Sequence, residues 1–341
     1  MDNVYIQKII KQIKSDINNF TYNIDIFKKM DNLMINHEKY KRMLLKVTIK
    51  NQIITFENEN LGDNRKKRIV EMLNNMCSYI KSKNKILPDT VIYFNICDAY
   101  AYDYQDLPLF TIAKPKNKKG ILFPDDTFIC HKMETECDNW DKIKKTVIHN
   151  CDLEKDKINI IYFKGANTGS DKHNLRYLLS QENNLPIKIN LTDKYKPMYS
   201  FCKYKYLLNL PGHQPWSYRF KYLFLMNSLI IDVAIKQHYT TTEHNERWIN
   251  FFDSIFVPNE DYIELEYDWY EKKDNKDEYR KLVTNIKKTY EYYENNPEEY
   301  YKITKSGYNK VQMISNQFVL EMLYDLIVRY SNKLTDFIDQ L

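Results

Sequence analysis

The sequence is poor in glycine and proline, and it lacks several short motifs that identify common nucleotide-binding and metal-binding proteins. Its 341 residues include only 6 glycines and 10 prolines. Neither G-x-G-x-x-G nor G-x-x-x-x-G-K occurs, which argues against a dinucleotide site and a Walker-type triphosphate site. No D-x-D pair of aspartates occurs either, so a common carboxylate arrangement for holding a divalent metal is absent. Any ligand of this chain must be inferred from other patterns.

The sequence also has no dense set of cysteines and no long apolar segment. Six cysteines form neither a C-x-x-C pair nor a regular framework, so we expect reduced thiols rather than disulfides. The N-terminal segment is charged and amphipathic, without the apolar core of a signal peptide, and no segment is long enough to span a membrane. The chain ends in D-F-I-D-Q-L, which is not a retention signal, and we expect a cytoplasmic protein. His238, Glu243 and His244 lack metal-site spacing, and a polar loop explains them better.

Length and composition favour a globular protein of two domains. A chain of 341 residues is longer than a domain with a single hydrophobic core usually is, and 43% of its residues are hydrophobic. The formal net charge is only +5 and the basic and acidic residues are interspersed, so no nucleic-acid-binding groove is indicated. Lys, Asn, Ile and Tyr are frequent, which suggests an AT-rich genome such as that of a protist or a large DNA virus.

The pattern of predicted elements changes near the middle of the chain. Residues 150–157 are polar and precede a new strand, so we place the boundary there and predict domains at 1–152 and 153–341. In the second half, strands alternate with helices, which indicates a parallel α/β domain that binds ligands at the carboxyl ends of its strands. Proline and glutamate after Asn296 predict a helix start and a helical C-terminal tail. The main predicted strands are 43–57 (two strands joined at Lys50-Asn51), 91–96, 109–113, 158–163, 187–191, 204–210 and 229–233, and the main helices are 65–83, 174–180 and 218–229.

One strand–turn–helix unit in the second half has the pattern of a phosphate site. Residues 204–210 alternate like a strand, Gly212 lies in the turn, and Ser217 stands at the N-cap position of the helical run 218–229. In such a unit, free backbone N–H groups face the turn and stabilise an anion there. Arg219, in the first helical turn, adds a planar donor group suited to a diphosphate.

A second strand-to-helix loop in the same half also contains glycine. Gly165 and Gly169 follow the strand 158–163, and with Gly212 they are three of the 6 glycines in the chain. Scarce glycine at such positions indicates backbone that a ligand approaches closely. The plain alternative for either loop alone is an ordinary turn glycine flanked by solvated charges.

These residues also resemble a known family. The order K-Y-K-Y-L-x-N, a turn, S-Y-R-F, K-Y-L-F-L and S-L resembles the donor-binding core of glycosyltransferase family 90, which includes the protein O-glucosyltransferases (Rumi/KDEL-type) and the capsule-associated proteins. The turn is one residue longer here, and Gln214-Pro215-Trp216 replaces small residues. The loop F-K-G-A-N-T resembles the family's F-R-G-S-x-T, with Lys164 and Ala166 as substitutions. The resemblance and the two glycine loops together favour a nucleotide-sugar site.

The resemblance implies which residues hold the donor. The family has a further basic residue for the diphosphate, and a length difference of one residue lets it fall on Lys172, His173 or Arg176. We favour Lys172 or Arg176, because both are cations at neutral pH whereas a histidine is mostly neutral. The implied donor-binding residues are Gly165, Ala166, Asn167, Thr168, Lys172, Arg176, Gly212, Ser217, Tyr218 and Arg219.

An aspartate in the first half is the candidate general base. Asp98 follows the apolar strand 91–96, and F-N-I-C-D resembles the family's N-V-x-D, whose aspartate is the base. The segments P-L-F-T-I-A-K and F-P-D-D-T-F then follow in the family's order. By itself, an aspartate after a strand is more often a turn or cap residue, and Asp103 or Asp126 would be the alternative base. The family's D-Y-P is Asp98-Ala99-Tyr100 here, so the acceptor side differs.

The resemblance implies an α/β fold of the GT-B type, in which two Rossmann-like domains face a cleft and a helical tail follows. The first domain would bind the acceptor and the second the nucleotide sugar. One carboxylate base implies a single displacement with inversion, and without a D-x-D pair we expect no metal. We therefore expect an inverting glycosyltransferase that moves glucose or xylose from a UDP-sugar to a hydroxyl of a protein or glycan acceptor, without a cofactor. The alternatives are a catalytically degenerate member that binds glycans, and a protein that binds a nucleotide or polyphosphate for another purpose.

Overall fold

The computed structural model divides into two compact units. It describes residues 3–59, 64–97, 104–132, 137–151, 156–168, 175–192, 197–212, 214–238, 247–270 and 273–340. The first unit comprises Met1–His131, Ile249–Ile255 and Ser315–Leu341, and the second comprises Lys132–Trp248 and Phe256–Ile314. The division at 152/153 stays a prediction. By contacts, α5 (Trp140–Asn150) belongs to the second unit and α10 (Asn316–Ser331) to the first.

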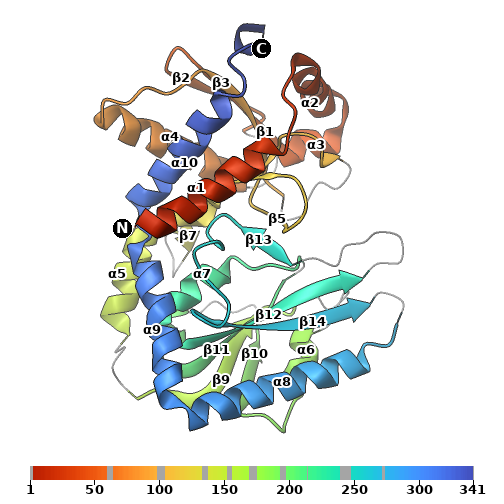
Figure 1. Cartoon of the computed structure of the whole chain (residues 1–341), viewed down its shortest axis with the longest axis vertical. Helices are drawn as coiled ribbons and strands as arrows, with labels where there is room; N and C mark the ends of the chain where they lie inside the picture. Colours follow the sequence, from red (N-terminus) through yellow and green to blue (C-terminus); the bar gives the residue numbers. More distant parts are fainter. Residues whose placement is uncertain are drawn as a thin grey trace. The chain divides into compact units, whose positions relative to one another are not determined.

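A five-stranded sheet forms the centre of the second unit, and all of its strand pairs are parallel (Figure 1). The spatial order is β10-β9-β11-β12-β14. The chain starts at β9, moves outward to β10, and returns past β9 to β11, so the direction of winding reverses between β9 and β11. Ligands of such sheets bind outside the carboxyl ends of the strands at this reversal. The strands are β9 (Ile158–Gly165), β10 (Ile187–Leu191), β11 (Tyr204–Asn209), β12 (Leu229–His238) and β14 (Ile263–Tyr270).

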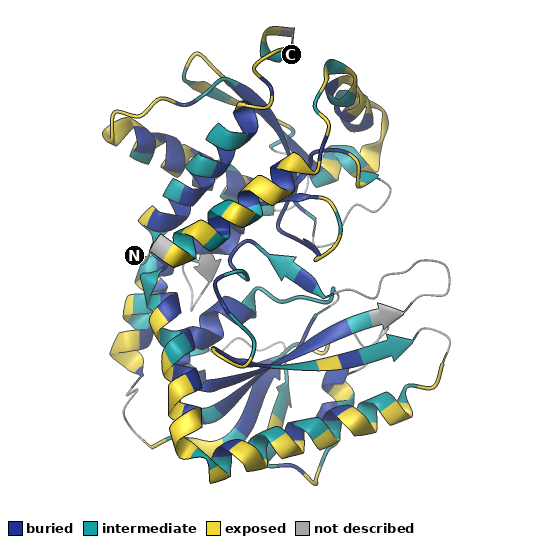
Figure 2. Cartoon of the chain, in the orientation of Figure 1, coloured by how far each residue is buried: buried dark blue, intermediate teal, exposed yellow. Residues whose placement is uncertain are grey.

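Helices cover this sheet and bury its apolar side chains. Figure 2 shows largely buried central strands, while the outer stripe of α8 is exposed. The core joins Phe163, Leu208 and Ile231 of the sheet to Leu282 and Ile286 of α8. The further elements of this unit are β8 (Cys137–Asp138), α6 (Leu175–Ser180), η3 (Met198–Phe201), α7 (Arg219–Leu223), η4 (Phe224–Met226), α8 (Lys276–Asn295) and α9 (Pro297–Met313).

The first unit contains a mixed five-stranded sheet in the order β2-β1-β3-β4-β6. β1 (Leu44–Lys50) is antiparallel to both β2 (Ile53–Glu57) and β3 (Thr90–Asn95), whereas β3 is parallel to β4 (Phe110–Thr111). β4 is also parallel to β6 (Ile121–Leu122). The other elements are α1 (Asn3–Asn18), α2 (Ile24–Asn36), α3 (Glu38–Met43), α4 (Asn64–Ser82), β5 (Ala113–Pro115), η2 (Asp126–Phe128), α10 and η5 (Ile338–Gln340). β7 (His131–Lys132) and β13 (Trp248–Asn250) each contain residues of both units.

The predicted α/β class is confirmed, and many local predictions are close. The hairpin of β1 and β2 turns at Asn51 and Gln52, whose φ angles of 52° and 66° suit a tight turn between antiparallel strands. The helix predicted at 65–83 is α4, and α9 begins at Pro297 as expected. None of the described helices combines the length and the apolar character that a membrane span requires.

The helix predicted at 218–229 is shorter than expected. α7 begins at Arg219 and ends at Leu223, and η4 continues only to Met226. Asn227 then adopts a left-handed conformation with φ 47°, which ends the helix before β12 begins at Leu229. The apolar run misled the prediction because nearly all of these side chains are buried, so their spacing does not mark one helical face.

The expectation of reduced cysteines is wrong for Cys151 and Cys202, and also for Cys130, which is disulfide-bonded. Cys151 and Cys202 form a disulfide across Cα atoms 5.9 Å apart, whereas Cys77 and Cys97 are free. The two cysteines are 51 residues apart in sequence, so no local sequence motif could predict the bond. Disulfides persist mainly in oxidising compartments. The cysteines therefore give no support to the cytoplasmic location predicted from the sequence.

Candidate functional site

Two strand-to-helix loops of the second unit meet at the reversal point of its sheet. Gly165 is the last residue of β9, and α6, which carries Arg176, follows that loop. Gly212 follows the end of β11, and Arg219 is the first residue of α7. Because β9 and β11 are parallel neighbours, both loops leave the same edge of the sheet. The order of the strands in the sheet therefore brings together residues from two loops that are separate in the sequence.

Arg176 connects the two loops. Its Nη1 donates to the backbone oxygen of Ala166 at 2.7 Å and to Oγ1 of Thr168, both in the loop after β9. Its Nη2 donates to the backbone oxygen of Leu210 at 3.1 Å, just after β11. The residue is only 5% exposed, and its Nε has no hydrogen-bond partner among the described residues. Arg176 thus fixes the distance between the loops and still has donor capacity left.

Arg219 lies against the same aromatic ring as Arg176. The guanidinium carbon of Arg219 is 4.8 Å from the centre of the Phe163 ring, and that of Arg176 is 5.1 Å from it. A Cβ atom at Gly165 would lie 2.8 Å from Nη2 of Arg219. Glycine at this position leaves room for the guanidinium, which a side chain would displace. Nη1 of Arg219 is shielded from solvent and has no hydrogen-bond partner in the described part of the chain.

The buried Arg176 and the partly buried Arg219 form a positive centre that has no counter-charge among the described residues. Neither makes an ion pair with a carboxylate among the residues that the structure describes. Burial lowers the pKa of Arg219 to about 10. Burial, and then the charge of Arg219, lower the pKa of Arg176 to about 9. Both remain protonated at neutral pH. An anion that accepts hydrogen bonds from both guanidinium groups would offset their mutual repulsion and compensate for the hydration that they lose on burial.

The residues before α7 complete the second loop. Oγ of Ser217 accepts from the backbone nitrogen of Arg219 at 3.2 Å. The N-cap residue of α7 is Tyr218, however, so the predicted N-cap at Ser217 is wrong by one residue. The Tyr218 ring packs edge-on against Trp216, with ring centres 4.5 Å apart. A Cβ at Gly212 would be 3.6 Å from Oγ1 of Thr168, which is ordinary contact. Since α7 has only five residues, its dipole is small, and the guanidinium of Arg219 adds a full positive charge at its first residue.

The predicted donor-site residues that the structure describes belong to these two loops. Asn167 is exposed in the first loop, between Ala166 and Thr168. Lys172 and His173 lie outside the described residues, so their roles stay predictions. Of the three positions considered for a second diphosphate cation, Arg176 is the one whose contacts the structure describes.

Sequence reasoning missed Phe163 and a polar pair beside the loops. Nδ2 of Asn209 donates to Oδ1 of Asp232 at 2.7 Å, and these two residues are register partners at the end of β11. Both are buried, and Oδ1 of Asn209 has no hydrogen-bond partner among the described residues. A polar residue directly after an apolar strand, as in Y-L-L-N and L-I-I-D, is the signal that could have identified them.

In the first unit, Asp126 is held in ion pairs. It is fully buried, Oδ1 lies 3.6 Å from Nε of Arg65, and Oδ2 accepts from Arg68. Burial, and then Asp125, raise the pKa of Asp126. Arg65 also donates to the backbone oxygen of Ile96 at 2.5 Å. These contacts indicate a structural role for Asp126 rather than the alternative role of base, while Asp98 and Asp103 lie outside the described residues.

Comparison with known proteins identifies one family. The family model described as Glycosyl transferase family 90 matches residues 5–337. The matched range includes both five-stranded sheets and the two loops described above. No curated protein matches the chain significantly.

The contact between Gly165 and Arg219 generates a prediction. Gly165→Ala places a methyl group against the far end of the arginine side chain, which can shift without disturbing the backbone. We expect UDP affinity, measured by calorimetry, to fall roughly threefold to tenfold because the guanidinium is displaced. The melting temperature should stay close to that of the wild type.

The double variant with Arg219→Ala tests whether this loss acts through the arginine. In that background Gly165→Ala should have little further effect, since coupled residues are non-additive. An equal loss with and without Arg219 would contradict the argument and would mean that the methyl group obstructs the nucleotide directly.

Proposed function

The chain belongs to glycosyl transferase family 90 and is a glycosyltransferase, and from this premise we propose that it is an inverting, metal-independent enzyme that uses a UDP-sugar. The expected sugar is glucose or xylose, and the expected acceptor is a hydroxyl of a protein or glycan. We further propose a GT-B arrangement, in which the first domain binds the acceptor and the second binds the donor.

The observation that carries the proposal is the pair of arginines, Arg176 buried and Arg219 partly buried, at the reversal point of the parallel sheet. A UDP-sugar has a diphosphate between its nucleoside and its sugar, and this diphosphate leaves with additional negative charge during transfer. Arg176 and Arg219 each have an inaccessible guanidinium nitrogen without a partner in the described residues. Donors fixed before the reaction stabilise such charge without reorganisation. The proposed site therefore suits the leaving group better than it suits a neutral ligand.

The proposed reaction is a single displacement. Asp98 takes the proton of the acceptor hydroxyl while that oxygen forms a bond to the anomeric carbon of the donor. The bond between the anomeric carbon and the phosphate oxygen breaks at the same time, and its electron pair leaves on UDP. Attack opposite to the leaving group inverts the anomeric configuration. In this scheme Arg176 and Arg219 hold the diphosphate, and Ser217 supports the loop from which Arg219 projects.

Replacement of Arg219 tests the donor site. Arg219→Ala removes a charge-assisted contact of about 1.5–3 kcal/mol, so UDP affinity should fall about tenfold or more. Isothermal calorimetry with UDP measures this. Arg280→Ala is the matched control, because Arg280 lies on α8 with its side chain 75% exposed. Unchanged affinity in a folded Arg219→Ala protein would refute the assignment.

Chelation tests the proposed independence from metals. Without a D-x-D pair, the arginines are the proposed counter-charges of the leaving group. We expect release of UDP from a UDP-sugar to continue at an unchanged rate in excess EDTA. An activity that is lost on chelation and restored by manganese would show instead that an ion supports the leaving group.

Replacement of Asp98 tests the proposed base. Asp98→Asn keeps the shape of the side chain and removes its basicity, so turnover should fall roughly 10²–10⁴-fold while UDP affinity is retained. Asp277→Asn is the control, because this carboxylate is 93% exposed on α8. Sugar transfer at nearly the wild-type rate would assign the base to another acid.

A further inference from the structure

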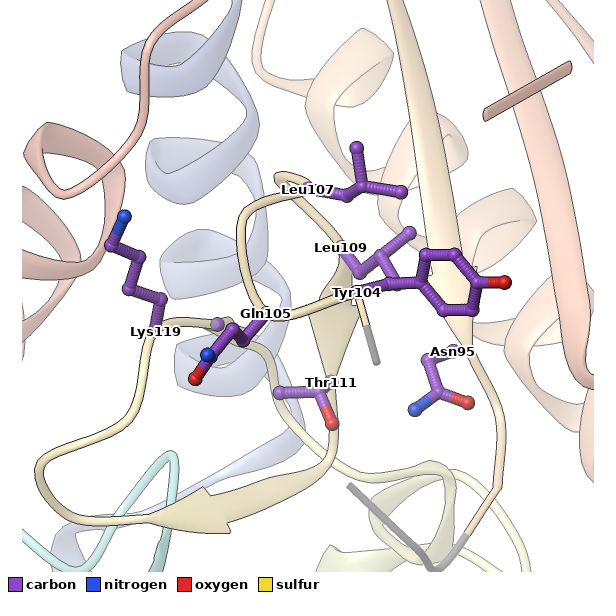
Figure 3. Close-up of a pocket in the computed structure, with 8 residues that line it drawn as sticks. Asn95, Tyr104, Gln105, Leu107, Leu109, Thr111 and Lys119 are labelled. Carbon is purple, nitrogen blue, oxygen red and sulfur yellow. The ribbon is translucent and has the colours of Figure 1, made fainter. Parts of the chain in front are cut away.

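A hollow in the first unit is too small to hold a sugar or a nucleotide. It lies at the ends of β3 and β4, where Asn95 and Thr111 are register partners (Figure 3). Its cavity volume is about 10 Å³, which is the lower limit for about one water molecule. Its lining residues are Asn95, Tyr104, Gln105, Leu107, Leu109, Thr111, Lys119 and Gly120. Arg176 and Arg219 of the second unit, by contrast, keep donor nitrogens without a partner in the described residues.

The Phe163 ring lies at the carboxyl end of β9, beside the glycine that ends the strand. Phe163 precedes Gly165 by two residues, so the alternation of side chains places both on one face of the sheet. A Cβ atom at Gly165 would lie 3.2 Å from Cζ of the ring and 2.8 Å from Nη2 of Arg219. The edge of the ring and the guanidinium therefore meet at the glycine. The ring is only 1% exposed.

The same ring contacts two cations that repel each other. The guanidinium carbons of Arg219 and Arg176 lie over the Phe163 ring, 4.8 Å and 5.1 Å from its centre. The face of an aromatic ring is negative and attracts a cation within about 6 Å. Burial, and then the charge of Arg219, lower the pKa of Arg176, so the two guanidinium groups repel. The ring offers each of them an attraction that partly offsets this repulsion.

An aromatic ring compensates the arginines in a different way from a carboxylate. A carboxylate would accept the hydrogen bonds of the guanidinium and neutralise its charge. A ring attracts the cation through its π electrons and leaves its net charge unchanged. Nη1 of Arg219 and Nε of Arg176 have no hydrogen-bond partner among the described residues. Both arginines therefore stay charged and keep donor capacity for an anion.

Core packing is the plain alternative role of Phe163. The residue belongs to the buried core of the second unit, together with Leu175 and Leu179 of α6. Packing depends on the volume and apolar character of the side chain. The attraction for the arginines depends on the electrons of the ring face as well. The two roles can therefore be separated by changing the electrons while the shape of the ring is kept.

We propose that Phe163 is a positioning residue of the donor site, whose ring face holds the two guanidinium groups side by side before the diphosphate binds. This inference rests on the proposed function, because it gives the ring a role toward the leaving group of a nucleotide sugar. A weaker attraction lowers the fraction of unliganded molecules in which both arginines are in place. The apparent affinity for the diphosphate then falls with that fraction.

The experiment changes the electrons of the ring and keeps its shape. Phenylalanines with one, two or three ring fluorines are incorporated at position 163 of the full chain, because each fluorine weakens the negative face. Calorimetry measures the affinity for UDP and for inorganic pyrophosphate, release of UDP from UDP-glucose and UDP-xylose measures donor hydrolysis, and circular dichroism confirms folding. Phe163→Leu removes the ring altogether. The same fluorine series at Phe94 is the matched control, since this ring is fully buried against Phe110 and Phe123 in the first unit.

We expect the affinity for UDP to fall with each fluorine at position 163, roughly threefold to thirtyfold in total. Phe163→Leu should lose at least as much. The series at Phe94 should leave the affinity within about twofold of the wild type. In the Arg219→Ala background, the series at position 163 should have a smaller effect, because one of the two cations is absent.

The possible failures are distinguishable. Wild-type affinity for UDP in all folded fluorinated proteins, with or without a loss in Phe163→Leu, assigns a packing role and overturns the inference while the proposed function stays intact. An equal loss in the Phe94 series also overturns it. Absence of both UDP binding and donor hydrolysis in the wild type refutes the proposed function. Pyrophosphate then decides about the ring: affinity that falls along the series supports the inference, and unchanged affinity or no binding overturns it.

Discussion

The repulsion between two adjacent arginines, one buried and one partly buried, is the constraint on which the candidate site depends. Arg176 and Arg219 lie against one Phe163 ring, and no carboxylate in the described residues compensates them. Three hydrogen bonds from Arg176 to the loops after β9 and β11 help to hold this unfavourable arrangement in place. The glycine at position 165 leaves room for the second guanidinium. Positive charge is thereby fixed where a departing diphosphate needs it, before any substrate binds.

The order of the strands makes this arrangement possible. β9 and β11 are adjacent although β10 and α6 lie between them in the chain, so two loops that are distant in sequence leave the same edge. The first unit uses parallel strands in a similar way. There the ends of β3 and β4 place Asn95 beside Thr111, and Arg65 binds the backbone of Ile96 directly after β3. Each unit therefore presents polar groups at strand ends, with the apolar residues buried behind them.

Much of the local structure could be predicted from the sequence. Alternation and turn residues located the hairpin of β1 and β2, and the limits of β10 agree with the predicted strand 187–191. The glycine loops and Arg219 stood out because of residue types that are rare in this chain or suited to phosphate. The helix at 218–229 was predicted too long, since burial on several sides hides helical periodicity and Asn227 ends the run. The base assignment to Asp98 rests on sequence resemblance, because the structure does not describe that residue.

The sequence by itself determined the α/β class, most strands and helices, the family and the residue types of the donor loops. These features depend on neighbours within a few positions or on motifs that keep their order along the chain. Only the tertiary structure decided that Arg176 and Arg219 lie against the same Phe163 ring and that Cys151 bonds to Cys202. It also decided that Asn95, Tyr104 and Lys119 line one hollow. Each of these contacts joins residues that are distant in sequence. They meet because the order of the strands and the packing of the helices bring distant segments together. Local helix and strand preferences do not determine that arrangement.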